Sequence, residues 1–286
     1  MDQQKCGEMM SLEDVHTLLL YLLWQINRVS EETGIPYFAH AGTLIGVLRH
    51  KGFIPWDDDV DLLMERKYYG DFVAACKKLF PPEVVVRTRE DDPYFCEEYI
   101  KICFKDDVCQ YSELAVDIFL LDETDPSREK FRRFQSKIIR RVRPIKLYKV
   151  SRLCGYMEPY TPKKKAARIL LAIASVLPLK FLTAIQSWAM TAEKKKTDYF
   201  VDWGSTSGYQ RATRPKYFFE HAQKMPFENG YIYASDRAEE MADFVFKKSN
   251  WRELPPPEKR KSHSVHQINN PRLDVEEIRQ FVDGKY

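Results

Sequence analysis

Four aspartates within a five-residue window are the residues of this chain whose types and spacing best suit chemistry. They follow a Gly-Thr pair and a basic cluster, and the full set is Gly42, Thr43, Arg49, His50, Lys51, Asp57, Asp58, Asp59 and Asp61. Carboxylates this close repel one another unless a cation lies among them. The combination of acidic and basic residues therefore indicates a site at which a metal ion assists the handling of phosphate.

The last two of these acids are predicted to lie on a β-strand, residues 59–64. Successive side chains of a strand point to opposite faces, so Asp59 and Asp61 share one face while the apolar residue between them enters the core. Two carboxylates on one strand face can share a divalent ion, and Mg²⁺ completes its coordination shell with water and phosphate oxygens. We therefore expect Asp59 and Asp61 to bind Mg²⁺, with Mn²⁺ as a substitute.

Two other interpretations of the acidic run must be considered. A run of acids is often only a solvated turn, but the apolar residues Ile54 and Trp56 precede this one and make solvation less favourable. A calcium-binding loop would need Gly and Glu at two positions where the chain has Leu62 and Tyr68. The calcium interpretation therefore fails.

A further acid, Asp117, lies in the middle of an apolar segment, residues 114–121, that is predicted to be a strand. A lone carboxylate in such a strand costs several kcal/mol unless it is paired or bound to metal. A salt bridge to a basic neighbour is one explanation, and a third carboxylate for the same metal ion is the better one. Lys101, in the predicted strand 99–104, is either a surface lysine or a ligand of the phosphate.

Helices and short strands are expected to position these residues. Ser11 and Asp14 have the spacing of a capping box, and apolar residues then recur at helical intervals until Gly34. A strand over residues 35–40 and a helix over residues 43–50 would put the Gly-Thr turn at a helix N-terminus, where backbone N–H groups can bind a phosphate. The other predicted elements are helices over 68–80, 235–246 and 275–282, a strand over 84–88, a strand and turn over 226–233, and two helices within 166–190 that meet near Pro178.

The middle of the chain is both basic and apolar. Residues 128–143 contain eight Lys and Arg residues, and lysine triplets at 163–165 and 194–196 flank the apolar segment 166–190. Helices with a solvated basic face are the default interpretation, and docking on an anionic membrane surface is the sharper alternative. Binding of nucleic acid is weakly supported, because aromatic residues are not interleaved there as a stacking platform.

Composition places the chain among ordinary folded proteins. The chain has 44% hydrophobic and 30% charged residues, and its net charge is only +3. Its six cysteines form no C-x-x-C pair, which argues against a zinc site and favours a reducing compartment. Neither a signal-peptide core nor an uncharged run of about 18–20 apolar residues is present. We therefore expect a cytoplasmic protein, either fully soluble or peripheral to the cytoplasmic membrane.

The residues singled out above resemble the LicD family, which also includes the fukutin-related proteins. The matching segments are 42–61, 116–122, 227–228 and 254–263. The resemblance implies an α+β fold in which helices flank a mixed, nucleotidyltransferase-like β-sheet, here with a helical annex. Superfamily members have a Gly-Thr or Gly-Ser turn, a strand with two alternating acids and a third acid on a later strand, a pattern that here corresponds to Asp59, Asp61 and Asp117.

Members of this family transfer phosphocholine, or a similar phospho-alcohol, from a CDP-linked donor to a glycan such as teichoic acid or lipopolysaccharide. The resemblance therefore implies a metal-dependent transferase that releases CMP, with a CDP-alcohol donor, a glycan or lipid-linked acceptor and no nucleic-acid partner. Asp59, Asp61 and Asp117 would bind the metal, and Asp58 or a metal-bound acid would accept the proton of the acceptor. The residues expected to contact substrate are Gly42, Thr43, Arg49, His50, Trp56, Lys101 and His263.

Three parts of the chain are predicted. Residues 1–126 would form the catalytic core, residues 127–200 a helical insertion that offers an acceptor or membrane face, and residues 201–286 a part that completes the core and covers the site. Two other functions stay open: a nucleotidyltransferase that makes an NDP-activated intermediate, and a non-catalytic nucleotide-binding regulator. Release of pyrophosphate from a nucleoside triphosphate, or absence of magnesium-dependent nucleotide binding, would favour these alternatives.

Overall fold

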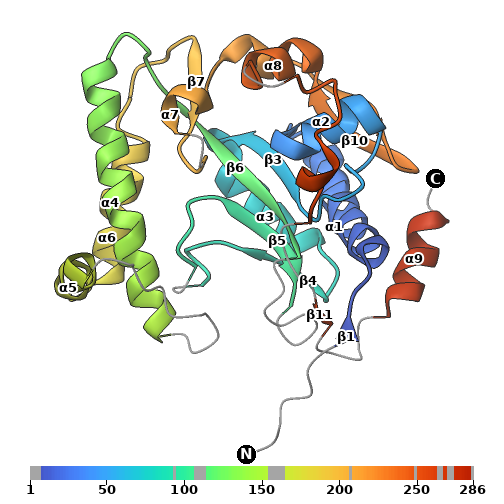
Figure 1. The fold of residues 1–286 in the computed structure, drawn as a ribbon, viewed down its shortest axis with the longest axis horizontal. Helices are drawn as coiled ribbons and strands as arrows, with labels where there is room; N and C mark the ends of the chain where they lie inside the picture. The colour runs from blue at the N-terminus through green and yellow to red at the C-terminus, as the bar shows by residue number, and fades with distance from the viewer. Residues whose placement is uncertain are drawn as a thin grey trace, which may run out of the picture. The chain divides into compact units, whose positions relative to one another are not determined.

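The computed structural model describes residues 8–92, 95–105, 114–153, 165–205, 208–247, 250–262, 267–268 and 274–284. It is an α+β structure with a mixed β-sheet and helices, as predicted (Figure 1). The chain divides into two compact units. The first consists of Met1–Val86, Ile100–Phe119 and Phe218–Tyr286, and the second of Arg87–Tyr99 and Leu120–Tyr217. Compact units need not coincide with domains, so the division at residues 126 and 200 stays a prediction.

The sheet of the first unit has the strand order β2-β3-β6-β5-β4. These strands are β2 (Phe38–Ala39), β3 (Val60–Glu65), β4 (Val84–Arg87), β5 (Ile100–Phe104) and β6 (Ala115–Glu123). β2 pairs antiparallel with β3, and β5 pairs antiparallel with β6. β3, which contains Asp61, and β6, which contains Asp117, are therefore neighbours near the middle of the sheet.

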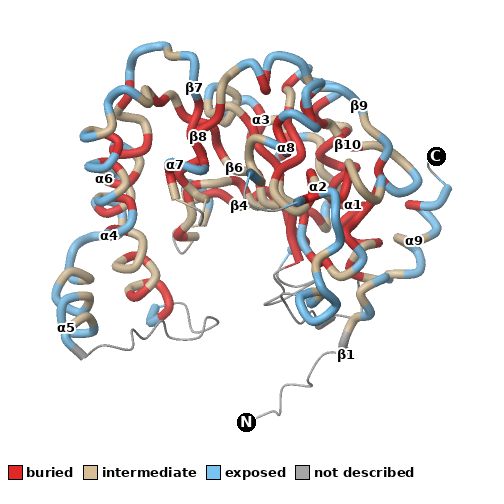
Figure 2. The backbone as a smooth tube through the Cα atoms, turned by 45° about the horizontal axis from the view of Figure 1, so that its top comes forward, coloured by how far each residue is buried: buried red, intermediate tan, exposed pale blue. Residues whose placement is uncertain are grey.

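The central helix of the first unit is α1, which lies almost entirely in the core. It spans Leu12–Thr33, and the hydroxyl of Ser11 accepts a hydrogen bond from the backbone N–H of Asp14 at 3.1 Å, as the capping box predicted. The helix ends at Gly34, whose φ of 69° is the left-handed conformation that glycine adopts without strain. Figure 2 shows α1 and the sheet as mostly buried backbone.

The remaining elements of the first unit surround this core. The helices are α2 (Ala41–His50), α3 (Tyr69–Leu79), α8 (Ala238–Val245) and α9 (Val275–Asp283), with 3₁₀ turns at Arg66–Tyr68 and Pro257–Lys259. β9 (Ala222–Phe227) and β10 (Gly230–Ser235) form an antiparallel hairpin, and β1 (Glu8–Met9) pairs with β11 (Gln267–Ile268). A further 3₁₀ turn, Lys216–Phe219, lies where the chain returns to this unit.

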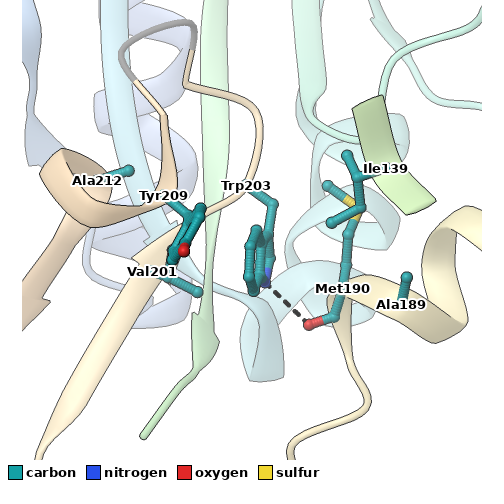
Figure 3. Packing of buried hydrophobic residues seen from close by; sticks show 7 residues of the cluster. All are labelled: Ile139, Ala189, Met190, Val201, Trp203, Tyr209 and Ala212. Carbon is teal, nitrogen blue, oxygen red and sulfur yellow. Dashed lines mark hydrogen bonds between the residues drawn. The ribbon is translucent and has the colours of Figure 1, made fainter. Parts of the chain in front are cut away.

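The second unit is mainly helical. Its helices are α4 (Glu129–Leu153), α5 (Lys165–Ala174), α6 (Leu179–Met190) and α7 (Tyr209–Ala212). β7 (Tyr199–Asp202) pairs antiparallel with the end of β6 and with β8 (Thr213–Pro215). Its core is shown in Figure 3, where Trp203 packs beside Tyr209 and Val201, and its indole N–H donates a hydrogen bond to the carbonyl of Met190 at 3.1 Å.

Most predicted elements are present with shifts of a few residues at their ends. The helices expected within residues 166–190 are α5 and α6, which are separated at Pro178 as predicted. The strand expected over residues 35–40 is limited to β2, and Asp59 lies just before β3 rather than inside it. Among the described residues no single helix is long and apolar enough to cross a membrane, although α5 and α6 together satisfy length and composition with a bend of 101°.

Candidate active site

The Gly-Thr turn and the acidic run meet at the start of α2. A Cβ atom at Gly42 would lie 2.6 Å from Oδ2 of Asp57, so only glycine lets this carboxylate approach the helix so closely. A carboxylate at a helix N-terminus is stabilised by the exposed N–H groups and by the helix dipole. The position that we predicted for a phosphate at Gly42 is therefore approached by a carboxylate of the chain itself.

Thr43 joins α2 to the acidic strand. Its buried hydroxyl accepts a hydrogen bond from the backbone N–H of Asp61 at 2.9 Å. On the other side, the carbonyl of Asp61 accepts a hydrogen bond from the N–H of His40 at 2.9 Å. Asp61 is thus fixed by backbone contacts on both sides, and Thr43 acts in this structure by positioning it.

Five side chains share one face of the sheet. Phe38 and Ala39 pair with Leu63 and Leu62, so His40 continues opposite Asp61 and points to the same side. The ring of His40 lies 6.0 Å from that of Phe119 on β6. Asp117 lies two residues before Phe119 on β6, so its side chain points to the same face. Lys101 on β5 lies directly opposite Asp117. The side chains on this face are therefore those of His40, Asp61, Lys101, Asp117 and Phe119. Two predicted metal ligands and a predicted phosphate ligand therefore lie on one sheet face.

Asp117 forms an ion pair with Lys101 on this face. The Nζ atom of Lys101 lies 3.3 Å from Oδ1 of Asp117, and each side chain is about one-fifth exposed (23% and 22%). The salt-bridge explanation for the charge on β6 therefore holds in this structure. Solvent reaches part of each side chain, although Oδ1 of Asp117 is itself buried, and the role of Asp117 as a metal ligand stays a prediction.

The acids at positions 57 and 58 are buried, whereas Asp59 is exposed and Asp61 is half-buried. The backbone carbonyl of Asp57 accepts a hydrogen bond from Nε2 of His16 at 2.7 Å, and the imidazole stacks on Phe53 with 4.1 Å between ring centres. The carboxylate of Asp58 accepts a hydrogen bond from the Ser262 hydroxyl at 2.6 Å. These contacts fix the loop from which Asp59 projects.

The basic cluster is held against the C-terminal segment. One nitrogen of Arg49, Nη1, donates hydrogen bonds to the carbonyls of Trp251 and Glu253, each at 3.0 Å, and Nε donates to His50 at 2.9 Å. Burial lowers the pKa of Arg49 and of His50, with the neighbouring cations as a further cause. The guanidinium is thus partly occupied by backbone contacts, which differs from the predicted role of a group that mainly binds diphosphate.

Residues from the C-terminal segment also reach the predicted substrate residues. The guanidinium of Arg260 lies 5.5 Å from the ring centre of Trp56, and Ser262 contacts the acidic loop. The segment over residues 251–262 therefore contacts Trp56 and the acidic loop, and its role as a cover of the site stays a prediction. His263, the remaining predicted substrate residue, lies outside the described residues.

Glu228, at the turn of the β9–β10 hairpin, supports the start of the acidic loop. Its carboxylate accepts a hydrogen bond from the N–H of Phe53 at 2.8 Å and packs against Gly52, where a Cβ would collide with it. Its own N–H donates to the carbonyl of Lys51 at 2.8 Å, and its φ of 51° is uncommon for a residue other than glycine. From the sequence, Glu228 was noted only as part of the segment 227–228 that resembles the LicD family.

Two histidines at the site were not predicted: His16 on α1 and His40 before α2. His16 is 41 residues away from its partner Asp57, and no local pattern connects them. His40 was assigned to a strand end by its apolar neighbours, and only the register of β2 with β3 places it beside Asp61. The one available sequence signal was the presence of a polar ring on an otherwise apolar strand.

The fit of a metal ion rests on the chemistry of the donor set. Asp59, Asp61 and Asp117 supply the carboxylate oxygens that Mg²⁺ prefers, and two of them project from neighbouring strands on one face. Among the described residues no group of three or more His, Cys, Asp or Glu side chains is close enough together to hold a metal ion. The binding of a metal ion by these three aspartates therefore stays a prediction.

One known protein family matches part of the chain. Residues 34–147 match the family described as "LicD/FKTN/FKRP, nucleotidyltransferase domain". This range is similar to a LicD-family domain. The predicted resemblance is therefore confirmed, and the matched range includes all four clustered aspartates, Asp117 and Lys101.

A curated relative is similar over nearly its whole length. The chain is 27% identical over 268 residues to the lipopolysaccharide cholinephosphotransferase LicD of Haemophilus influenzae, covering 90% of this chain and 97% of that protein. Among solved structures, terminal uridylyl transferase 4 from Trypanosoma brucei with bound CTP matches with a TM-score of 0.23 and 11% identity, over 97% of this chain and 91% of that chain. The same enzyme with bound GTP matches with a TM-score of 0.21 and 10% identity, over 96% of this chain and 97% of that chain. These TM-scores are too low to support any conclusion.

Proposed function

We propose that this LicD-family protein is a metal-dependent transferase that moves phosphocholine, or a similar phospho-alcohol, from a CDP-linked donor to a hydroxyl of a cell-surface glycan or its lipid-linked precursor. The similarity to a lipopolysaccharide cholinephosphotransferase over almost the full length of both chains supports this class of reaction. The observation that most directly supports the chemistry is the shared sheet face, where Asp61 and the Lys101–Asp117 pair lie together.

In this proposal Asp59, Asp61 and Asp117 hold Mg²⁺ or Mn²⁺. The ion supplies neutralisation of the charge on the donor diphosphate and of the departing CMP. Lys101, whose Nζ lies 3.3 Å from Oδ1 of Asp117, would contact a phosphate oxygen of the donor through its ammonium group. Thr43 and His40 keep Asp61 in position through the backbone.

The proton of the attacking hydroxyl must be accepted by a carboxylate on the open side of the loop. Asp58 is only 2% exposed and bonded to Ser262, whereas Asp59 is exposed. We therefore favour Asp59 over Asp58 for this role and assign Asp58 to holding the loop. Arg49 and His50 are assigned to joining α2 with the 251–253 segment at the edge of the donor site.

The decisive experiment incubates the protein with Mg²⁺ and a panel of CDP-alcohols and measures release of CMP. Asp61→Asn and Asp117→Asn should each lower the rate by at least about a hundredfold, because both remove negative charge from the cation site. Asp71→Asn, at an exposed position of α3, is the matched control and should keep the wild-type rate. Full turnover in both site variants, with circular dichroism unchanged, would disprove the proposed site.

A second function is supported by the description of the matched family as a nucleotidyltransferase domain. In that case the protein would join a nucleoside triphosphate to a phospho-alcohol and release pyrophosphate. Incubation with CTP and phosphocholine, followed by a pyrophosphate assay, tests this alternative directly. Pyrophosphate without any CMP from the CDP-alcohol panel would replace the transferase proposal.

A further inference from the structure

The second unit exposes an unusual amount of apolar surface. Among the described residues, thirteen large apolar side chains are strongly exposed, and nine of them lie between residues 134 and 188. They are Phe134, Leu153, Ile169, Leu170, Ile173, Val176, Leu177, Phe181 and Trp188. The exposed fraction reaches 67% at Leu170 and 81% at Val176. Large exposed apolar patches are rare on proteins that contact only water.

Helix α5 is the centre of this surface. It contains eight apolar residues among ten, and none of its described side chains is buried; Figure 2 shows the helix and the following turn as exposed or intermediate. Helix α6, in contrast, buries one side through Leu182, Gln186 and Ala189. Phe181 and Trp188 lie on its exposed side. An apolar helix without a buried face lacks the partner that ordinarily stabilises it.

The turn between these helices is held in place by α4. The ammonium group of Lys149 donates hydrogen bonds to the carbonyls of Ser175 and Leu177, at 2.9 Å and 2.7 Å. Val176, the most exposed of the large apolar side chains, lies between the two bonded residues. The exposed position of this turn is therefore a built feature of the unit and not a loose chain end.

An aromatic pair connects the apolar surface to the basic helix. The rings of Phe134 on α4 and Trp188 on α6 meet edge to face, with 6.5 Å between their centres, and each is about half exposed. Lys137 and Arg141 follow Phe134 by three and seven residues, so they lie on the same side of α4. Cations thus flank the exposed aromatic residues.

The charge of this part of the chain is opposite to that of the remainder. Residues 127–190 contain 16 Lys and Arg residues but only 2 Asp and Glu residues. The whole chain contains 45 basic and 42 acidic residues, so the part outside this range has 11 more acidic than basic residues. The exposed apolar residues therefore belong to the most positively charged segment of the molecule.

We infer that α5, α6 and the adjoining face of α4 dock on the surface of an anionic phospholipid bilayer. The apolar side chains would enter the headgroup and acyl-chain boundary, and the cations would contact lipid phosphates. A nucleic acid or a charged glycan could match the cations but would leave the apolar residues in water. The ten residues of α5 extend about 15 Å, half the hydrocarbon thickness of about 30 Å, and the 101° bend also favours docking in the plane over spanning.

This inference does not depend on the transfer reaction, and its test uses the full chain without substrate. The protein is mixed with vesicles of phosphatidylcholine alone or with 30% phosphatidylglycerol, and co-flotation is measured. We expect binding to the anionic vesicles, with a blue shift of Trp188 fluorescence that is lost in Trp188→Phe. No binding to anionic vesicles, or equal binding to neutral ones, would overturn the inference.

Variants separate the apolar contribution from the ionic one. Leu170→Ser with Ile173→Ser should weaken vesicle binding at least about tenfold, because apolar insertion is lost. Lys137→Gln with Arg141→Gln should have a similar effect that high salt reproduces. Lys77→Gln with Lys78→Gln, exposed on α3, is the charge control and should bind as wild type. A nucleic-acid surface would be indicated instead if the protein bound RNA but no vesicles, and if the variant with Leu170→Ser and Ile173→Ser bound RNA as tightly as the wild type.

Discussion

At the scale of single residues, the site depends on close approaches that only particular side chains allow. Gly42 admits the carboxylate of Asp57 to the start of α2, and Thr43 anchors the backbone of Asp61. Asp58, buried against Ser262, keeps the preceding loop fixed. The buried Asp57 and Asp58 thus hold the loop in place, whereas the side chain of Asp59 is exposed to solvent.

The first prediction concerns Gly42. Gly42→Ala introduces a Cβ only 2.6 Å from Oδ2 of Asp57, so the carboxylate must move. We expect the free energy of unfolding to fall by about 1–3 kcal/mol, together with a loss of transfer activity. Gly70→Ala is the control, since nothing lies within 4 Å of the added atom. Urea unfolding of both variants measures the difference, and equal stability would contradict the close approach.

The second prediction concerns His16. Burial lowers its pKa below the ordinary value of 6.5, and the hydrogen bond to the carbonyl of Asp57 only partly opposes this. The unfolded chain therefore takes up a proton near pH 6.5 while the folded chain does so only at lower pH. The stability that neutral His16 provides is complete above about pH 6.5 and is lost as the pH falls through the folded pKa.

His16→Gln tests this prediction, because its amide can still donate to the carbonyl but does not titrate. We expect the free energy of unfolding of the wild type to fall more steeply than that of His16→Gln between pH 7 and pH 5. His221→Gln, an exposed position, is the control and should follow the wild-type curve. Parallel curves for the wild type and His16→Gln would refute the assignment.

At the scale of elements, the site is made by parts of the chain that are far apart in sequence. β3 supplies Asp61 and β6 supplies Asp117. The start of α2 and the β9–β10 turn support the loop that precedes β3. The β6 strand links the units, because its first half belongs to one and its last residues to the other. Each acid is therefore positioned by a regular element, which limits its motion relative to the others.

The third prediction tests the hairpin support. Glu228→Ala leaves the buried N–H of Phe53 without its acceptor, and we expect a loss of about 1–3 kcal/mol in the free energy of unfolding. Glu228→Gln keeps an oxygen that can accept this bond and should lose clearly less stability. Chemical denaturation of both variants decides the matter, and equal losses would mean that the charge of Glu228 matters rather than its hydrogen bond.

At the scale of the whole molecule, the two units differ in charge and in exposed apolar surface. The sheet face that carries Asp61 and Asp117 lies in the first unit, as does the LicD-family match apart from its residues 87–99 and 120–147. The basic, exposed apolar helices lie in the second. The proposed donor site and the inferred bilayer-docking surface together would suit an acceptor that is presented by a membrane. Vesicle binding and CMP release can be measured independently.

A fourth prediction concerns ligands. Mg²⁺ with CDP-choline should raise the Tm by several degrees, since a ligand at about a hundred times its Kd stabilises by about 2.7 kcal/mol. The shift should vanish when EDTA removes the ion, and it should shrink in Asp61→Asn because one carboxylate of the cation site is gone. Differential scanning fluorimetry measures it, and an identical shift in EDTA would contradict a metal-dependent donor site.

The sequence alone determined most of the local elements, and it predicted a chemical type for the site. The capping box at Ser11, the break at Pro178 and the strand character of β3 and β6 follow from neighbouring residues, so local patterns predict them. The density of acids beside a Gly-Thr pair was likewise visible as a run of letters, and it led to the LicD family. Strand alternation predicted Asp59 and Asp61 on one strand face, but only Asp61 lies within β3.

Only the tertiary structure decided which distant residues meet. The ion pair of Asp117 with Lys101, the bond from His16 to the acidic loop and the contact of Glu228 with Gly52 join residues separated by 16, 41 and 176 positions. Sheet register and helix packing set these contacts through many weak interactions, so no short pattern encodes them. The same packing left α5 without a buried face, which composition alone could not distinguish from an ordinary core helix.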